Sequence, residues 1–521
     1  MKRFALFLLA LMLLCTSSFA SEALDKEGLN MENNSRVFYE IFVGSFSDSD
    51  GDGIGDLRGI INRMDYLNDG DPASGKSLGV EGLWLTPIFP SPSYHKYDAT
   101  DYYQIDPAFG TLEDLKELVS LCHARDVKLI MDLPLNHTSS NHNWFIQFSN
   151  AHLMHNPANI YYDFFTWIEP DAVIPSGRQF TKLPSGLALY ECNFSSSMPE
   201  LNFDNEKVRQ AVLDVAAYWL NLGVDGFRFD AAKYIYYGEH DRNVEFWTWY
   251  MDELKKINPH VYTVAEVWDG DGITSRYLKA FNCFHFSTAM AEGIIADTAK
   301  AGNVNNFTRA VQAYQEAIHS INPDAMDILF LANHDTDRAA GYLPMSNGRA
   351  QVAANLYLLS PGSPFIYYGE EIGLRGSRGG ANTDANRRLA MLWGDGDTVR
   401  NPAGSTYDSQ TPYSVKDLES MGGSLLKHYR KLIALRKANP EIAHGSYTAL
   451  SFPDTKAGGF LSEWNGSVVG VFHNTTNGTV ELDLSKSTNV TFSQVTFVGK
   501  GEAFLEGNIL TLEAQTSAVL R

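Results

Sequence analysis

Short apolar runs alternate with longer amphipathic segments along most of this chain, and this alternation constrains the fold more than any other feature. Runs of strand length separated by helical segments are typical of βα units, which build a parallel sheet. Eight such runs follow Val37, and they are Phe38–Phe46, Gly79–Pro87, Lys128–His137, Gly223–Asp230, Val261–Trp268, Ala280–Ser287, Asp327–Asp335 and Ser363–Glu371. Between them, apolar residues recur three and four positions apart, as in amphipathic helices, in Leu112–Arg125, Glu206–Leu222, Asn243–Ile257, Asn305–Ile321 and Gly348–Ser360. Because eight βα units close into a ring, the sequence predicts an α/β fold of the (β/α)8 (TIM) barrel class.

Two parts of the chain depart from this alternation. Residues 138–205 are rich in Ser, Asn, Pro and aromatic residues and lack helical periodicity, so we expect an inserted subdomain after the third strand. An insertion at the carboxyl end of a barrel strand forms one wall of a cleft over the catalytic face. After a helix predicted at Leu425–Ala438, residues 441–521 contain short alternating strands with Gly and Asn turns, which predict a C-terminal antiparallel β-sandwich. The barrel then comprises residues 33–137 and 206–440.

The first twenty residues resemble an export signal. Basic residues at positions 2 and 3 precede an apolar run, Phe4–Leu14, and a small-residue end at Ala20. A membrane anchor is the disfavoured alternative, because this run is too short to cross a hydrocarbon core about 30 Å thick. We therefore expect cleavage after Ala20, a mature chain without a transmembrane span, and a secreted or periplasmic protein. Lipid anchoring at Cys15 is also disfavoured, since Leu14 is large where such sites carry a small residue.

Charge and cysteine content exclude some classes of function. The chain has 41 basic and 62 acidic side chains, a net charge of −21, so its surface should repel nucleic acid. After cleavage, Cys122, Cys192 and Cys283 would remain, with neither paired spacing nor zinc-like clustering. We expect no disulfide framework, and we expect a monomer.

Acidic and polar residues follow several predicted strands at the point where each strand ends. In a barrel these ends converge on one face, so we expect Asp230, Glu266 and Asp335 to meet there. Crowded carboxyl groups differ in pKa, because like charges disfavour joint ionisation, and one then donates a proton while another remains an anion. This pairing suits glycosidic bond cleavage. The alternative, in which each acid only caps the following helix, is less probable for several strand ends together.

Four ordered motifs resemble those of the α-amylase family of glycoside hydrolases. They are Asp132–His137, Gly226–Lys233, Glu266 and Asn333–Asp335, and the likeness extends from Val37 to about Trp393 and on into the C-terminal region. The resemblance implies Asp230 as the nucleophile and Glu266 as the general acid and then the base. It implies Asp335 as a third carboxylate that holds sugar hydroxyls and favours the distorted ring.

Charged side chains on the same strand ends support these roles. Arg228 lies two residues before Asp230 and projects to the same face of the strand, so it should orient that carboxylate. His137 and His334 can donate hydrogen bonds to hydroxyls of the reacting sugar. The alternative for both histidines is polar packing without contact to a ligand.

Four further substrate-binding residues follow from the resemblance. Tyr97 is similar to the family's stacking platform beneath the reacting sugar, and Lys233 to a residue on the leaving-group side. Asp98 and Arg388 resemble a pair that lines the same subsite as Tyr97, with a surface ion pair as the alternative.

An acidic, glycine-containing loop predicts a metal site. Alternate carboxylates on a tight loop offer hard oxygen ligands to one cation, and calcium is the ion that such ligands fit. The alternative is a solvated acidic turn, which close carboxylates disfavour through repulsion. The ligands would be Asp48, Asp50, Asp52, the Ile54 carbonyl and Asp56.

The resemblance also narrows the substrate. Met198–Asn202 is similar to a motif of branches between oligo-1,6-glucosidases and neopullulanases, whereas the small Ala231 favours α-1,4 over α-1,6 bonds. We expect an exported retaining α-amylase that cuts internal α-1,4 bonds of starch, glycogen and maltooligosaccharides. An α-glucosidase, a neopullulanase-like hydrolase or a 4-α-glucanotransferase would use the same residues. A catalytically silent carbohydrate-binding relative is a further alternative, against which the intact set of carboxylates argues.

Overall fold

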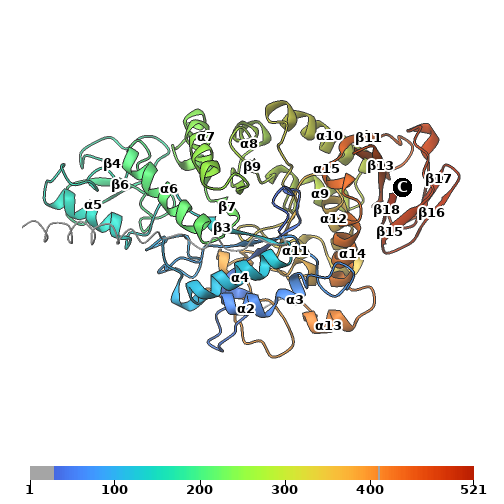
Figure 1. The fold of residues 1–521 in the computed structure, drawn as a ribbon, viewed down its shortest axis with the longest axis horizontal. Coiled ribbons are helices and arrows are strands. Elements are labelled where there is room, and N and C mark those ends of the chain that lie inside the picture. The colour runs from blue at the N-terminus through green and yellow to red at the C-terminus, as the bar shows by residue number, and fades with distance from the viewer. Residues whose placement is uncertain (1–28, 409–410) are drawn as a thin grey trace, which may run out of the picture.

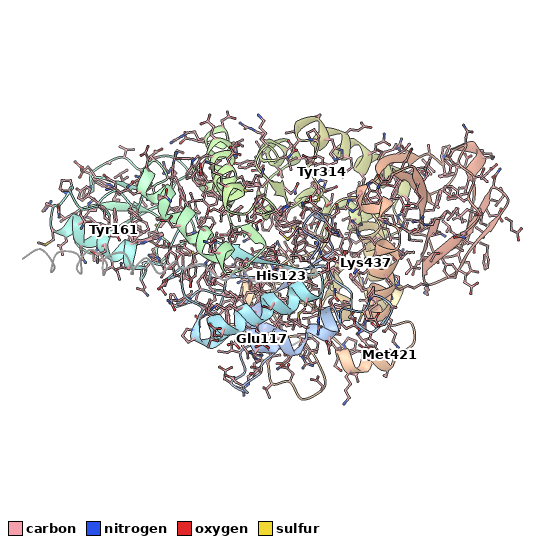
Figure 2. All side chains as sticks on the ribbon, viewed as in Figure 1. Glu117, His123, Tyr161, Tyr314, Met421 and Lys437 are labelled. Carbon is pink, nitrogen blue, oxygen red and sulfur yellow. The ribbon has the colours of Figure 1, made fainter. Side chains whose placement is uncertain are left out.

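The computed structural model describes residues 29–408 and 411–521, so the predicted export signal and Cys15 lie outside the described residues. Figure 1 shows three regions along the long axis. The region with α5, β4 and β6 lies at one end, a helix-surrounded sheet lies in the middle, and the C-terminal strands lie at the other end. In Figure 2, Tyr161 marks the first of these regions and Lys437 lies near the C-terminal strands.

A curled parallel sheet forms the centre of the molecule. Its strand order is β10-β1-β2-β3-β7-β8-β9. The strands are β1 (Phe38–Ile41), β2 (Gly82–Leu85), β3 (Lys128–Leu133), β7 (Gly226–Phe229), β8 (Tyr262–Ala265), β9 (Asn282–Cys283) and β10 (Phe365–Tyr367). Inside the sheet, Phe38 and Phe365 stack with ring centroids 4.6 Å apart and are buried beside Trp84.

The seventh predicted run, Asp327–Asp335, closes the ring without forming a regular strand. Ile328 pairs in parallel with Phe284 beyond β9, and the backbone N–H of Phe365 donates to the carbonyl of Leu329 at 2.8 Å. This segment therefore fills the position between β9 and β10, and the (β/α)8 barrel is confirmed. Beyond this pairing the chain turns at Asn333, whose backbone N–H donates to the Thr336 hydroxyl at 2.9 Å.

Amphipathic helices surround the barrel close to where the sequence predicts them. α4 begins with a capping box, in which Thr111 and Asp114 bond each other's backbone N–H groups. The larger helices are α4 (Leu112–Ala124), α6 (Glu206–Asn221), α7 (His240–Ile257), α10 (Val304–Ile321), α12 (Arg349–Leu358) and α14 (Leu425–Lys437). The shorter ones are α2 (Leu57–Asn62), α3 (Met64–Leu67), α8 (Asp271–Tyr277), α9 (Ile294–Ala299), α11 (Ala339–Tyr342), α13 (Val415–Ser420) and α15 (Glu441–His444).

The segment 138–205 contains a small sheet and one helix. The sheet order is β4-β6-β5, with β4 (Trp167–Ile168), β5 (Phe180–Lys182) and β6 (Leu189–Glu191). The expectation that this segment lacks helical periodicity is wrong for α5 (Asn143–Leu153), where Phe145, Phe148 and His152 are buried along one face. The apolar stripe consists of aromatic residues between Asn, Gln and Ser, which conceals its period.

The C-terminal region forms two antiparallel sheets, as expected for a β-sandwich. Their orders are β11-β12-β13-β18-β15 and β14-β17-β16, and a separate apolar core that includes Phe472 and Leu510 lies among them. The strands are β11 (Ser446–Leu450), β12 (Gly458–Trp464), β13 (Ser467–Asn474), β14 (Val480–Asp483), β15 (Val495–Gly499), β16 (Ala503–Glu506), β17 (Ile509–Leu512) and β18 (Thr516–Leu520).

Two expectations about the whole chain can be compared with the described residues. Within residues 29–408 and 411–521, each helix is either too short or too polar to cross a bilayer. The three cysteines among these residues are buried free thiols, at Cys122, Cys192 and Cys283.

Candidate active site

A fully buried arginine, Arg228, contacts carboxyl groups from three strand ends. The register pairs Arg228 on β7 with Asp132 on β3, and its Nη1 lies 2.9 Å from Asp132 Oδ1. The same Nη1 donates to Asp230 Oδ1 at 2.7 Å, and Nη2 donates to Glu266 Oε2. Parallel pairing thus brings Asp230 and Glu266 onto one guanidinium, although they are 36 residues apart in the printed sequence.

Glu266 is held in a proton-donating state. Burial raises the pKa of its carboxyl group from 4.5 to about 8, because Asp230 and Asp335 add to the effect of desolvation and outweigh Arg228 and His334. A carboxyl group with this pKa is protonated at neutral pH and can donate to a leaving oxygen.

Asp335 shows the opposite behaviour. Burial alone would raise its pKa, but His334 and Arg388 hold the pKa well below the usual range for an aspartate. His334 Nε2 lies 3.0 Å from Asp335 Oδ2, and Arg388 Nη2 lies 2.7 Å from Asp335 Oδ1. The site therefore combines a protonated acid with a firmly anionic carboxylate.

Tyr97 lies beside His334, whose ring is fully buried and so is not exposed for the predicted contact with a sugar hydroxyl. Their rings stack with centroids 5.4 Å apart, and the Tyr97 hydroxyl lies 2.7 Å from His334 Nε2 and 2.8 Å from Asp132 Oδ2. His334 Nδ1 lies 2.6 Å from Glu40 Oε1 on β1. Although burial lowers the pKa of His334, Asp335 and Glu40 outweigh it and raise the pKa to about 10, so the ring is a cation.

A cleft of about 870 Å³ lies over these groups. His137 borders it, and both of its buried ring nitrogens lack a hydrogen-bond partner among the described residues. Burial lowers the pKa of His137, so the neutral ring offers one donor and one acceptor. The predicted residues that line the cleft are Tyr97, His137, Asp230, Lys233, Glu266, Asp335 and Arg388.

The chain turns sharply after Asp230. Ala231 has a left-handed φ of 48° and leads into the short 3-10 helix Ala232–Tyr234, which carries Lys233. Lys233 Nζ donates to the carbonyl of Trp268 at 2.6 Å and contacts Asp269 Oδ2 at 3.0 Å. Lys233 therefore joins the loop after Asp230 to the loop after Glu266.

Arg388 lines the cleft together with Tyr97, as expected, whereas Asp98 does not. Asp98 accepts hydrogen bonds from the Ser91 hydroxyl at 2.7 Å and from Ser93, and it is not among the residues that line the cleft. Arg388 instead binds Asp335 and the Tyr94 hydroxyl. The cleft lining that includes Arg388 also includes another carboxylate, Asp384, which accepts hydrogen bonds from Arg378. Asp384 lies four residues before Arg388, and that spacing was the available sequence signal.

Two buried acids at the site were given no role from the sequence. Asp132 accepts hydrogen bonds from Arg228, Tyr97 and Trp84. Burial and the neighbouring Asp230 raise its pKa to about 6 against the effect of Arg228. Glu40 has its partner 294 positions away in the sequence, at His334, so only the closed barrel brings them together.

The acidic loop brings three of its carboxylates together. Oxygens of Asp48, Asp50 and Asp56 lie within 4.8 Å of one another. Asp48 also accepts the Thr398 hydroxyl at 2.6 Å, and these contacts and backbone N–H groups lower its pKa despite burial. Asp52 Oδ1 accepts the backbone N–H of Ile54 at 2.7 Å. Because no ion pair with Lys or Arg neutralises these acids among residues 29–408 and 411–521, the donor set fits a hard cation.

Comparison with known proteins identifies the family. The model of the alpha amylase catalytic domain matches residues 40–445, which run from within β1 through the last barrel strand, β10. The chain belongs to the α-amylase family. It is therefore an enzyme of a family of glycoside hydrolases, as the strand-end motifs predicted.

Relatives in this family differ in activity. Alpha-amylase 3 of Dictyoglomus thermophilum is 36% identical over 445 residues, covering 84% of each chain. The solved α-amylase of H. orenii has a TM-score of 0.81 and 38% identity, and the match covers 94% of this chain and 99% of that one. An oligo-1,6-glucosidase of Bacillus cereus is 30% identical over 492 residues, covering 79% of this chain and 85% of its own. Other matches are named 4-alpha-glucanotransferase and trehalose synthase/amylase, at 27% and 30% identity.

Proposed function

We propose that this protein is an exported α-amylase that hydrolyses internal α-1,4-glucosidic bonds with retention of the anomeric configuration. The observation that carries the proposal is the arrangement at Arg228, which bonds Asp230 through one nitrogen and Glu266 through the other. A protonated acid and a carboxylate on one guanidinium are the two groups that a retaining glycosidase requires.

The proposed reaction has two steps. In the first, Asp230 attacks the anomeric carbon and forms an ester bond with the sugar, while Glu266 gives its proton to the departing oxygen. In the second, the ionised Glu266 takes a proton from water, whose oxygen bonds the anomeric carbon, and the ester bond to Asp230 breaks. Glu266 and Asp230 thereby regain their starting states.

The remaining residues of the cleft bind and orient the sugar. Asp335, held anionic by His334 and Arg388, accepts hydrogen bonds from sugar hydroxyls near the positive charge that develops on the ring. His137 has unpartnered nitrogens for a further hydroxyl. Tyr97 presents a ring fixed by its hydroxyl contacts, on which the reacting sugar can lie.

Action on internal bonds is supported by the shape around the site. A second cavity of about 820 Å³ shares Trp268, Asp335, Arg378 and Arg387 with the cleft, which itself is about 870 Å³. Two neighbouring cavities with shared walls could hold a chain on both sides of the cleaved bond. An exo-acting α-glucosidase requires only a closed pocket for one terminal sugar.

We also propose that the acidic loop binds calcium. Asp48, Asp50 and Asp56 would hold the ion, with Asp52 and the Ile54 carbonyl as further ligands from the sequence pattern. The ion would neutralise the loop and stabilise its contact with Thr398. Export remains part of the proposal, and N-terminal sequencing of the secreted protein, with a start at Ser21, would support it.

Product analysis tests the proposed function. Amylose should give a mixture of maltooligosaccharides from the earliest times, and pullulan should resist cleavage. Release of glucose alone would indicate an exo-glucosidase, and lengthened chains would indicate a transferase. The Glu266→Gln variant should lose turnover while it still binds maltoheptaose, and an active variant would contradict the assigned acid. Starch binding by the wild type without new reducing ends would identify a silent relative.

A further inference from the structure

Trp268 forms the wall where the two cavities meet. It follows Glu266 by two residues, is 39% exposed and lines both cavities. Its ring lies flat on Phe286, with centroids 4.7 Å apart and an interplanar angle of 11°. A chain that extends from one cavity into the other along this side would lie against Trp268, which Phe286 supports from below its ring.

The residue before Phe286 is a buried histidine outside the cleft. His285 is 5% exposed and is not among the residues that line either cavity. Its Nδ1 lies 2.8 Å from Asp327 Oδ1, and its Nε2 lies 3.5 Å from Asp271 Oδ1. Its ring stacks on Tyr314 of α10, labelled in Figure 2, with centroids 3.6 Å apart.

These contacts connect separate elements of the barrel. Asp327 belongs to the short seventh segment, and it also accepts Gln315 Nε2 of α10 at 3.4 Å. Asp271 is the first residue of α8 and accepts the Ser287 hydroxyl at 2.7 Å. His285 therefore fixes the segment that carries Phe286 between the barrel and the start of α8.

The loop with Trp268 is held separately on its other side. Lys233 bonds the Trp268 carbonyl and Asp269, and the Thr274 hydroxyl bonds the Val267 carbonyl at 3.1 Å. The carboxyl group of Glu266 is bound by Arg228, whose other hydrogen bonds go to Asp132 and Asp230 and not to the contacts of His285. Loss of the His285 contacts should therefore disturb the aromatic wall more than the reacting groups.

We propose that His285 is a positioning residue for the substrate cleft, whose contacts with Asp271 and Asp327 hold the Trp268–Phe286 stack against a bound glucan chain. The inference rests on the proposed function, because it assigns the wall to a glucan that spans both cavities. It predicts that long chains depend on His285 and that short chains, confined to the main cleft, do not.

The charge of His285 gives the inference a pH signature. Burial lowers its pKa, but Asp327 and Asp271 outweigh burial and raise the pKa to about 9. Tyr314 is the other titratable group in contact with the ring. Since the raised pKa belongs to the folded protein, the cationic contacts are complete at neutral pH and are lost as pH rises through about 9.

Binding in the Glu266→Gln background tests the inference without interference from turnover or from titration of Glu266. Calorimetry with maltoheptaose and maltotriose should be carried out between pH 7 and pH 10. Adding His285→Asn should weaken maltoheptaose binding at pH 7 by roughly 2- to 10-fold, the range for loss of one aromatic contact, and change maltotriose binding by less than twofold. The maltoheptaose affinities of the His285 form and the Asn form should differ at pH 7, and this difference should shrink as pH rises through about 9. Titration of His334 is common to both forms and cancels in the comparison.

Further variants separate positioning from general damage. His319→Asn on α10 is the matched control, because His319 Nε2 lies 3.1 Å from the Ala325 carbonyl and the residue lines neither cavity. In a Trp268→Ala background, His285→Asn should add no further loss. If His285→Asn fails to fold, Asp271→Asn, at a residue whose side chain is 50% exposed, should weaken maltoheptaose binding in the same direction.

The outcomes distinguish the inference from the proposed function. Equal maltoheptaose affinity with and without His285, or equal losses for both oligosaccharides, would overturn the positioning role. An unaltered affinity in Asp271→Asn would do the same. Failure of the parent Glu266→Gln protein to bind either oligosaccharide would contradict the proposed function itself.

Discussion

The acid at the site should reduce the stability of the folded protein at neutral and alkaline pH. Burial, Asp230 and Asp335 raise the pKa of Glu266 from 4.5 to about 8, so the folded state keeps a proton that the unfolded state releases. The stability contributed by Glu266 is therefore complete below about pH 4.5 and falls as pH rises towards 8. At 1.36 kcal/mol per pH unit, the loss approaches about 5 kcal/mol above pH 8 and is roughly 3–4 kcal/mol between pH 5 and pH 8.

The Glu266→Gln variant removes this titration while it retains the shape of the side chain. We expect the variant to be more stable than the wild type at pH 8, with the difference in melting temperature growing by roughly 3–6 °C between pH 5 and pH 8. Scanning calorimetry of both proteins across this range measures the difference. Glu245→Gln, which makes the same chemical change at an exposed position on α7, is the matched control. A pH-independent difference for Glu266→Gln, or a variant that loses stability relative to the wild type as pH rises, would refute the reasoning.

Three further predictions concern Arg228, His137 and the acidic loop proposed to bind calcium. Arg228→Lys should lower kcat on amylose on the order of 100-fold, because a lysine cannot bond Asp132, Asp230 and Glu266 together. Near-wild-type turnover of this variant would argue against an orienting role for Arg228. His137→Ala should raise the barrier for kcat/KM by about 1–3 kcal/mol, because the unpartnered ring nitrogens can then no longer bond a sugar hydroxyl. Normal kcat/KM in a variant that has lost only stability would indicate packing instead. Chelation with EDTA should lower the melting temperature by a few degrees, as expected for removal of a ligand that contributes about 3 kcal/mol to stability. Asp50→Asn should diminish this response. Identical melting temperatures with calcium and with EDTA would contradict the proposed metal site.

The sequence predicted the barrel and the convergence of its strand ends because both depend on local patterns. Apolar runs and helical periodicity identify each βα unit, and parallel pairing then places Asp230, Glu266 and Asp335 at one end. Arg228 was also predictable, since it shares a strand face with Asp230.

Side-chain pairing across loops could not be predicted in the same way. Arg388 binds Asp335 and Tyr94, whereas Asp98 is satisfied by Ser91 and Ser93 within its own turn. The choice depends on loop geometry that no period in the sequence reports. The contact of Glu40 with His334 likewise requires the closed ring.

The most direct test of the central claim is to trap the intermediate on Asp230. A fluorinated maltosyl substrate that forms the glycosyl-enzyme quickly and hydrolyses slowly should add one maltosyl group to the protein, detected by mass spectrometry. Peptide mapping should place that group on Asp230, and the Glu266→Gln variant should accumulate the same adduct when the leaving group needs no acid. An adduct on another residue, or turnover without any covalent adduct, would contradict the account.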